Sequence, residues 1–157
     1  MILYHGSTIA VEKPDIYHSR DRVDFGKGFY TTSILLQARK WSERFVRLNQ
    51  PGVVSRYFFD DNALKTVKLL EFRDYSEEWL DFIISCRKGQ DQTDYDIVIG
   101  GVANDRVFNT IELYISNLAT KAETINRLKY EKPNLQICFR TQGVIDKFLR
   151  YEGCEQV

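Results

Sequence analysis

The sequence predicts a single α+β domain that spans residues 1–157. Segments rich in β-branched and aromatic residues mix with segments of helical spacing, and the two kinds do not alternate regularly. A chain of 157 residues, 43% of them hydrophobic, is long enough to bury a core without disulfides or metal. Regular alternation would indicate a doubly wound parallel sheet, so the mixed order favours the α+β class.

The predicted strands are short and combine branched with aromatic side chains. They cover residues 2–5, 29–32, 53–59, 67–72, 95–99 and 135–139. The first strand runs into Gly6, and the fifth runs into Gly100 and Gly101.

The predicted helices follow from apolar residues spaced three and four apart. The clearest set is Ile34, Ala38, Trp41, Phe45 and Leu48, which lie on one helical face. Further helices are expected over 79–86 and 111–118, and after Thr120, where Thr120 and Glu123 have capping-box spacing. A short helix over 144–149 is expected to close the chain.

Charge and cysteine content narrow the class of protein. Lys plus Arg equals Asp plus Glu at 22 each, so no overall field attracts nucleic acid or a membrane. The cysteines are Cys86, Cys138 and Cys154, an odd number without CxxC spacing, which argues against a disulfide framework or a zinc site. With no signal-peptide pattern and no long apolar run, we expect a cytoplasmic protein with no metal and no membrane partner.

The first candidate motif is His5-Gly6-Ser7, at the end of the first predicted strand. An imidazole and bare glycine backbone at a strand end suit a cleft that a flat ligand approaches closely. The alternative is that the strand ends in a turn and His5 is a satisfied core residue.

The second motif runs from Asp24 to Thr32 and contains Phe25-Gly26-Lys27-Gly28-Phe29-Tyr30. Two glycines before an aromatic strand indicate a tight loop that delivers Tyr30 to a site. The spacing fits neither a phosphate-binding loop nor a dinucleotide fingerprint, and a plain glycine hairpin is the alternative. The polar segment 14–28 contains few apolar anchors, and we expect it to be mobile until a ligand binds.

Together these motifs resemble the NAD+ signature of ADP-ribosyltransferases with a His-Tyr-Glu triad, the diphtheria-toxin and poly(ADP-ribose) polymerase type. The chain looks like a small stand-alone bacterial family of that superfamily, catalogued as a domain of unknown function. The resemblance implies a split, mostly antiparallel sheet with flanking helices, on which His5, Tyr30 and the third motif converge.

The resemblance also implies roles for single residues. His5 would hydrogen-bond the adenosine ribose, and the Gly6 backbone would pair with the nicotinamide carboxamide. Tyr30 would stack on the nicotinamide ring with Trp41 on its other side, although Trp41 alone reads as a core residue. The NAD+-binding set also includes Ser7 and Gly28. Ala38 departs from family members that carry a serine there.

The third motif, 133–139, departs from the family at its catalytic position. The position of the triad's Glu, at the start of a late strand, matches Gln136, which supplies a hydrogen bond but no charge to the oxocarbenium-like transition state. This leaves three possibilities for the missing charge. Another acid, such as Glu112 or Glu131, enters the site, the target supplies the carboxylate, or the reaction is slow. A carboxylate restored at position 136 is then expected to raise hydrolysis of NAD+. Asn134 matches a target-recognition position of related toxins.

The resemblance therefore implies a mono-ADP-ribosyltransferase that uses NAD+ as co-substrate. There are two alternatives: an NAD+ glycohydrolase, and a catalytically weak NAD+-binding or interaction module. Gln136 favours the weak module. Family habit suggests a toxin or defence effector with a neutralising antitoxin partner. The sequence leaves the acceptor, protein or nucleic acid, open.

Overall fold

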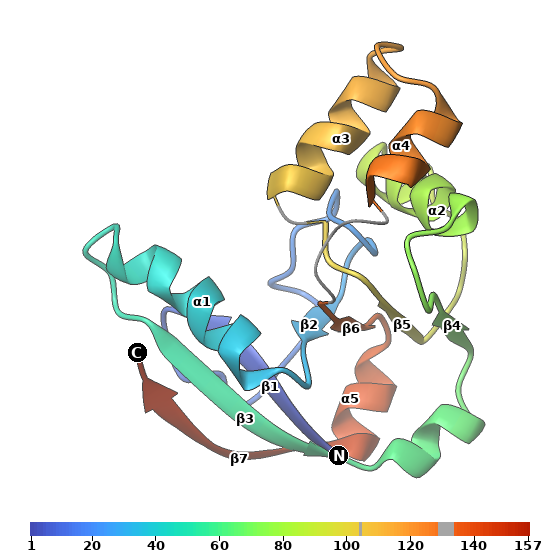
Figure 1. The fold of residues 1–157 in the computed structure, drawn as a ribbon. Coiled ribbons are helices and arrows are strands. Elements are labelled where there is room, and N and C mark those ends of the chain that lie inside the picture. Colours follow the sequence, from blue (N-terminus) through green and yellow to red (C-terminus); the bar gives the residue numbers. More distant parts are fainter. Residues whose placement is uncertain (104, 129–133) are drawn as a thin grey trace.

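The computed structural model describes residues 1–103, 105–128 and 134–157, which form an α+β fold with two sheets (Figure 1). The three-stranded sheet has the order β1-β3-β7 and the four-stranded sheet the order β2-β6-β5-β4. The strands are β1 (Ile2–Ser7), β2 (Phe29–Thr31), β3 (Val53–Phe59), β4 (Leu69–Glu71), β5 (Ile97–Gly100), β6 (Gln136–Phe139) and β7 (Leu149–Gln156). The helices are α1 (Leu35–Val46), the 3-10 helix η1 (Asp61–Lys65), α2 (Glu77–Arg87), α3 (Asp105–Ile115), α4 (Lys121–Leu128) and α5 (Gln142–Phe148). Of these strand pairs, only β4 with β5 is parallel, which confirms the predicted class.

The two sheets meet at one bridge and then separate. Tyr4 of β1 and Thr32, directly after β2, exchange two backbone hydrogen bonds of 2.8 and 2.9 Å. Beyond this bridge β1 continues beside β3, while β2 runs beside β6. The sheet is therefore split between β1 and β2.

Two clusters of buried apolar side chains lie on opposite faces of the four-stranded sheet. The first joins both sheets and includes the edge-to-face pair Phe59 and Phe139, with ring centroids 5.1 Å apart. The second contains Phe25, Trp79 and Val98, and lies beneath α2, α3 and α4. Neighbouring residues of a strand point to opposite faces, so the sheet is covered on both sides by apolar contacts.

Helix α1 packs against β1 and β3 through small residues. Ala38 and Ser42 are buried, and the Ser42 hydroxyl donates to the Val53 carbonyl at 2.9 Å. Gly6 of β1 permits this approach, because a Cβ there would lie 2.6 Å from both the Ala38 carbonyl oxygen and the Ser42 Oγ.

Two helices begin at side-chain caps, and the second of these caps was predicted. The Ser76 hydroxyl accepts from the Trp79 N–H at 3.2 Å at the start of α2. Before α4, the Glu123 N–H donates to Thr120 Oγ1 and the Thr120 N–H donates to Glu123 Oε2. These reciprocal bonds form the capping box that the sequence predicts.

The predicted short helix over 144–149 is confirmed as α5 (Gln142–Phe148), but the prediction that it closes the chain is wrong. Helix α5 is followed by β7, an edge strand that pairs along β3 with a register shift between Arg56 and Tyr57. The sequence of β7 is Leu-Arg-Tyr-Glu-Gly-Cys-Glu-Gln, and its exposed positions alternate with partly buried ones. An edge strand with one face exposed to solvent contains few apolar residues, so apolar periodicity does not detect it.

The expectation that the segment 14–28 has few apolar anchors is also wrong. Phe25 is fully buried in the second cluster, and Ile16 packs against the first. Backbone groups in this segment are bonded as well, since the Gly28 N–H donates to Ser19 Oγ at 3.1 Å. The loop is therefore attached to the core at several points.

We predict that Gly6→Ala destabilises the protein. The added Cβ overpacks the contact between β1 and α1, which costs about 1–3 kcal/mol in the free energy of unfolding. Gly143→Ala is the matched control, because a Cβ at Gly143 in α5 meets nothing within 4 Å. Urea unfolding should show the control unchanged or more stable by roughly 0.5–1 kcal/mol. Equal stability of the two variants would show that β1 and α1 are not in close contact.

Candidate active site

His5 lies at the split between β1 and β2, with its ring 4.6 Å from that of Phe29. Its Nδ1 lies 2.6 Å from the Tyr30 carbonyl oxygen. A carbonyl only accepts hydrogen bonds, so Nδ1 carries the proton. Burial lowers the pKa of His5 from its usual value of 6.5, an effect that the bond to Tyr30 opposes. At neutral pH the ring is therefore uncharged, and Nε2 is an acceptor for a hydroxyl group.

The backbone of Gly6 faces the same split. Tyr4 directs both its N–H and its C=O to Thr32, and backbone groups of alternate residues in a strand point to the same side. Those of Gly6 therefore also point away from β3. Within the described part of the chain, the Tyr4–Thr32 bridge is the only pairing of β1 on that side. Gly6 thus presents one donor and one acceptor without a strand partner.

The phenol of Tyr30 closes the glycine loop that precedes it. Its oxygen accepts from the Phe25 N–H at 2.9 Å and donates to the Gly26 carbonyl at 2.6 Å. Burial, with a smaller effect from Cys138, raises the pKa of Tyr30 well above its usual value of 10. The phenol is therefore neutral at physiological pH. Tyr30 can contribute its ring as a stacking surface, but it cannot act as a base.

Gly28 has a structural reason to be glycine. A Cβ at this position would lie 2.5 Å from both Cys138 Sγ and the Phe139 carbonyl oxygen. Its N–H is already bonded to Ser19. The structure thus explains Gly28 by packing and gives it no free donor for a ligand.

Gln136 opens β6 and is 7% exposed. Its Nε2 donates to Asp24 Oδ2 at 3.1 Å and to the Gly101 carbonyl oxygen at 3.2 Å. Both partners are acceptors, so the NH2 group must face them, which fixes the orientation of the amide. Oε1 has no hydrogen-bond partner among the described residues and is left as an acceptor.

Sequence reasoning missed Asp24 as a member of this site. Besides Gln136, its carboxylate accepts from the Ala103 N–H at 3.0 Å and from Arg87, whose NH2 group lies 2.5 Å from Oδ1. The side chains of Asp24 and Arg87 are only 13% and 16% exposed. These partners lie 63 to 112 positions from Asp24 in the chain, so no local pattern reveals them.

The register of the sheet places these groups together. Tyr30 lies opposite Cys138 and Thr31 opposite Ile137, so Tyr30 and Gln136 point to the same face of the four-stranded sheet. His5 contacts this unit through the Tyr30 carbonyl. Tyr30 and Gln136 thus share one face, whereas the His5 ring packs on Phe29, whose side chain points to the opposite face of β2.

Trp41 is not the core residue that its helical spacing suggests. Its side chain is 44% exposed, and the Arg44 guanidinium carbon lies 4.5 Å from its ring centroid. Ala38, three residues earlier on the same side of α1, is buried against Gly6. An exposed ring next to Gly6 is available to a planar ligand, since Trp41 Cδ1 lies 3.2 Å from where a Gly6 Cβ would be.

Ser7 and Asn134 are engaged in internal contacts. The Ser7 hydroxyl donates to the Ile9 carbonyl at 2.6 Å and so shapes the turn after β1. Asn134 Oδ1 accepts from the Val102 N–H at 2.7 Å and from the Tyr75 hydroxyl at 3.0 Å. Asn134 therefore holds the 100–103 loop beside Gln136. Its role in target recognition stays a prediction.

Of the two alternative acids of the sequence prediction, only Glu112 lies among the described residues. Glu112 is exposed on α3, and the structure shows no contact between it and Gln136. Glu131 lies outside the described residues. The nearby acid is Asp24, which the prediction did not include.

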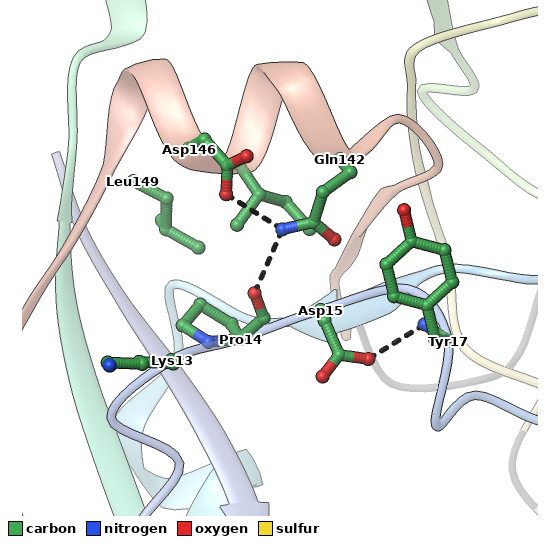
Figure 2. A pocket seen from close by; sticks show the side chains of 8 residues that line it. Lys13, Pro14, Asp15, Tyr17, Gln142, Asp146 and Leu149 are labelled. Atoms are coloured by element: carbon green, nitrogen blue, oxygen red, sulfur yellow. Dashed lines mark hydrogen bonds between the residues drawn. The ribbon is translucent and has the colours of Figure 1, made fainter.

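A separate surface cavity of about 550 Å3 lies between the 13–17 segment and α5 (Figure 2). Gln142 spans its wall, where Nε2 donates to the Pro14 carbonyl at 3.3 Å and to Asp146 at 2.8 Å, and Oε1 accepts from the Ile16 N–H. The residues that line this cavity include none of the predicted site residues. It marks where the long loop is attached to α5.

Metal ligands and membrane spans are absent from the described ranges. No group of three His, Cys, Asp or Glu side chains in residues 1–103, 105–128 and 134–157 is placed to hold a metal ion. Within the same ranges, no helix has the length and apolar character needed to span a bilayer. The three cysteines are free thiols, of which only Cys154 is exposed.

Comparison with known proteins gives the family of the chain. A family model described as "Protein of unknown function (DUF3990)" matches residues 1–151. The chain belongs to this family. The DUF3990 match includes His5, Tyr30 and Gln136, together with Asp24 and Arg87. Searches of curated proteins and of solved structures find no match.

We predict that His5 makes the stability of the protein depend on pH. The pKa of His5 is lower in the folded state than in the unfolded state, so below about pH 6.5 the unfolded chain binds more protons. The stability contributed by neutral His5 is present above that pH and is lost as the pH falls. His5→Asn keeps an N–H for the Tyr30 carbonyl without titrating. Urea unfolding between about pH 7.5 and 5 should therefore show a steeper loss for the wild type. Parallel curves would contradict a lowered pKa of His5 in the folded protein.

Proposed function

We propose that this protein is a mono-ADP-ribosyltransferase that uses NAD+ as co-substrate. The observation that carries the proposal is the Gln136 amide, which Asp24 and Gly101 hold by its NH2 group. Its Oε1 has no hydrogen-bond partner among the described residues and lies on the same sheet face as Tyr30. The position matches that of the catalytic Glu in the ADP-ribosyltransferases that the sequence resembles. An acceptor at this place would orient a ribose hydroxyl.

The groups at the split between β1 and β2 are complementary to NAD+. A carboxamide carries one carbonyl and one NH2 group, which match the N–H and C=O that Gly6 presents without a strand partner. Neutral His5 would accept a hydroxyl of the adenosine ribose at Nε2. The Tyr30 and Trp41 rings would lie on either side of the nicotinamide. A ring over its cationic form contributes roughly 0.5–2 kcal/mol.

In the proposed reaction, the bond between C1′ of the ribose and the nicotinamide nitrogen breaks. The electron pair goes to the ring nitrogen, and neutral nicotinamide leaves behind an oxocarbenium-like ribosyl cation. A nucleophile of the acceptor then bonds to C1′ and loses its proton to solvent. Gln136 would hold the ribose hydroxyl through both steps.

Two alternatives differ in the fate of the ribosyl group. A glycohydrolase would use water as the acceptor, and a binding module would hold NAD+ without breaking the bond. Gln136 in place of Glu is the feature that favours the binding module. A role as a toxin or defence effector, neutralised by an antitoxin, is part of the proposal by resemblance alone.

The deciding experiment uses the purified protein with NAD+ labelled in the adenylate phosphate, with and without total lysate. Nicotinamide release measures bond cleavage, and label in the protein or nucleic-acid fraction measures transfer and reveals the acceptor class. Release that requires lysate indicates transfer, and equal release without lysate indicates hydrolysis. Binding of NAD+ with no release under either condition would leave the binding module as the function.

We predict that Gln136→Ala lowers nicotinamide release by roughly 100-fold or more, because an interaction made mainly in the transition state is lost. The Kd for NAD+, measured by calorimetry, should change little. If Gln136→Ala releases nicotinamide at the rate of the wild type, Gln136 does not contact the reacting ribose.

We predict that the ring of Tyr30 contributes to NAD+ affinity independently of its hydroxyl. Tyr30→Leu should raise the Kd for NAD+ by roughly tenfold, which corresponds to about 1.4 kcal/mol of lost stacking. Tyr30→Phe is the control, since it keeps the ring and removes only the bonds to Phe25 and Gly26. Calorimetric titration of both variants distinguishes stacking from loop closure. An equal loss of NAD+ affinity in the two variants would show that Tyr30 acts only through the bonds of its hydroxyl to the glycine loop.

A further inference from the structure

Four separate parts of the chain meet at the Asp24 carboxylate. Oδ1 accepts from Arg87 at the end of α2, and Oδ2 accepts from the Ala103 N–H and from Gln136 at the start of β6. Each oxygen of the carboxylate is thus engaged, and the cation and the amide lie on different oxygens. The negative end of the Asp24–Arg87 pair therefore faces the Gln136 side chain.

We propose that Asp24 is a positioning residue that orients the Gln136 amide and increases the negative charge on its Oε1. The inference rests on the proposed function, in which Oε1 receives the ribose hydroxyl. A hydrogen bond from an amide N–H to a carboxylate is stronger than one between neutral groups, and it polarises the amide toward its carbonyl oxygen. Little water screens this bond, because both side chains are largely buried.

This arrangement compensates for the missing catalytic carboxylate. The negative charge lies one hydrogen bond behind the group that faces the substrate, at a distance of 3.1 Å from Gln136 Nε2. Gln136 relays part of that charge to the developing cation and still presents a neutral amide to the ground state. Arg87 pairs with the other oxygen of Asp24, and the Arg87 guanidinium carbon also lies 4.6 Å from the Phe108 ring centroid.

The same geometry reverses the expected effect of Gln136→Glu. An introduced carboxylate would face Asp24 Oδ2 and the Gly101 carbonyl oxygen, both of which are acceptors. Two carboxylates that share a site bind a proton between them, because one of the two pKa values rises. With the shared proton the variant resembles the wild-type amide, and without it the two charges repel each other.

Other titratable groups near Asp24 remain neutral across the relevant range. Burial, the largest cause in each case, raises the pKa of Cys86 and of Cys138 to about 12, and it raises that of Tyr30. The one charged partner of Asp24 among the described residues is Arg87. A pH effect created by Gln136→Glu therefore belongs to the introduced carboxylate and Asp24.

The test is a double-mutant cycle on nicotinamide release from NAD+. Asp24→Asn should lower kcat by roughly tenfold or more while KM changes less than about threefold, since a transition-state interaction is weakened. In a Gln136→Met background, Asp24→Asn should have no further effect on kcat, because Asp24 acts through Gln136. Asp91→Asn is the matched control. Asp91 forms an equally buried ion pair with Arg140, at 2.5 Å, and does not contact Gln136.

A pH profile keeps the inference testable even where Asp24→Asn fails to fold. Activity of Gln136→Glu should be highest at low pH and fall as the pair loses its shared proton, a fall that the wild type lacks. The inference is overturned by a kcat for Asp24→Asn that matches Asp91→Asn, by equal effects of Asp24→Asn in both backgrounds, or by parallel pH profiles for Gln136→Glu and wild type. Wild-type protein that releases no nicotinamide at all overturns the proposed function, and the inference falls with it.

Discussion

The fold depends on the point at which β1 leaves β2. One bridge, between Tyr4 and Thr32, joins the two sheets there, and the next residues of β1 turn toward α1. Gly6 makes this turn feasible, since its lack of a side chain lets the α1 backbone and Ser42 approach within a distance that no other residue allows. As a result, the backbone N–H and C=O of Gly6, which a continuous sheet would pair with a neighbouring strand, face the split, and the His5 ring lies beside them.

Apolar periodicity predicted most of the fold, because most elements bury one face. β3 has the predicted limits, Val53–Phe59, since branched and aromatic residues occupy nearly every inward position. The strand β7 was not predictable in this way, because it lies at a sheet edge and its sequence is mostly polar. Trp41 is a case in which periodicity predicts burial where there is none. Its spacing is that of a core residue, yet its side chain is exposed and the buried residues of α1 are Ala38 and Ser42.

The candidate site was predictable only in the residues that local motifs contain. His5, Gly6 and Tyr30 are each part of a short pattern at a strand end, and Gln136 opens a strand. Asp24 was visible in the sequence merely as a polar residue before Phe25. Its role follows from contacts with Arg87, Ala103 and Gln136, which only the tertiary fold brings together. Asn134 acts similarly, because it fixes the loop that supplies the Gly101 carbonyl to Gln136.

A relayed charge has consequences for the choice between transfer and hydrolysis under the proposed function. A carboxylate in direct contact with the ribose stabilises the cation whether or not an acceptor is bound, so water competes for it. A charge that acts through the Gln136 amide is farther away and partly balanced by Arg87, so it stabilises the cation less. Bond cleavage then depends more on the nucleophile that approaches C1′. A site of this kind breaks NAD+ slowly by itself and faster with the correct acceptor, which is the behaviour that a selective transferase requires.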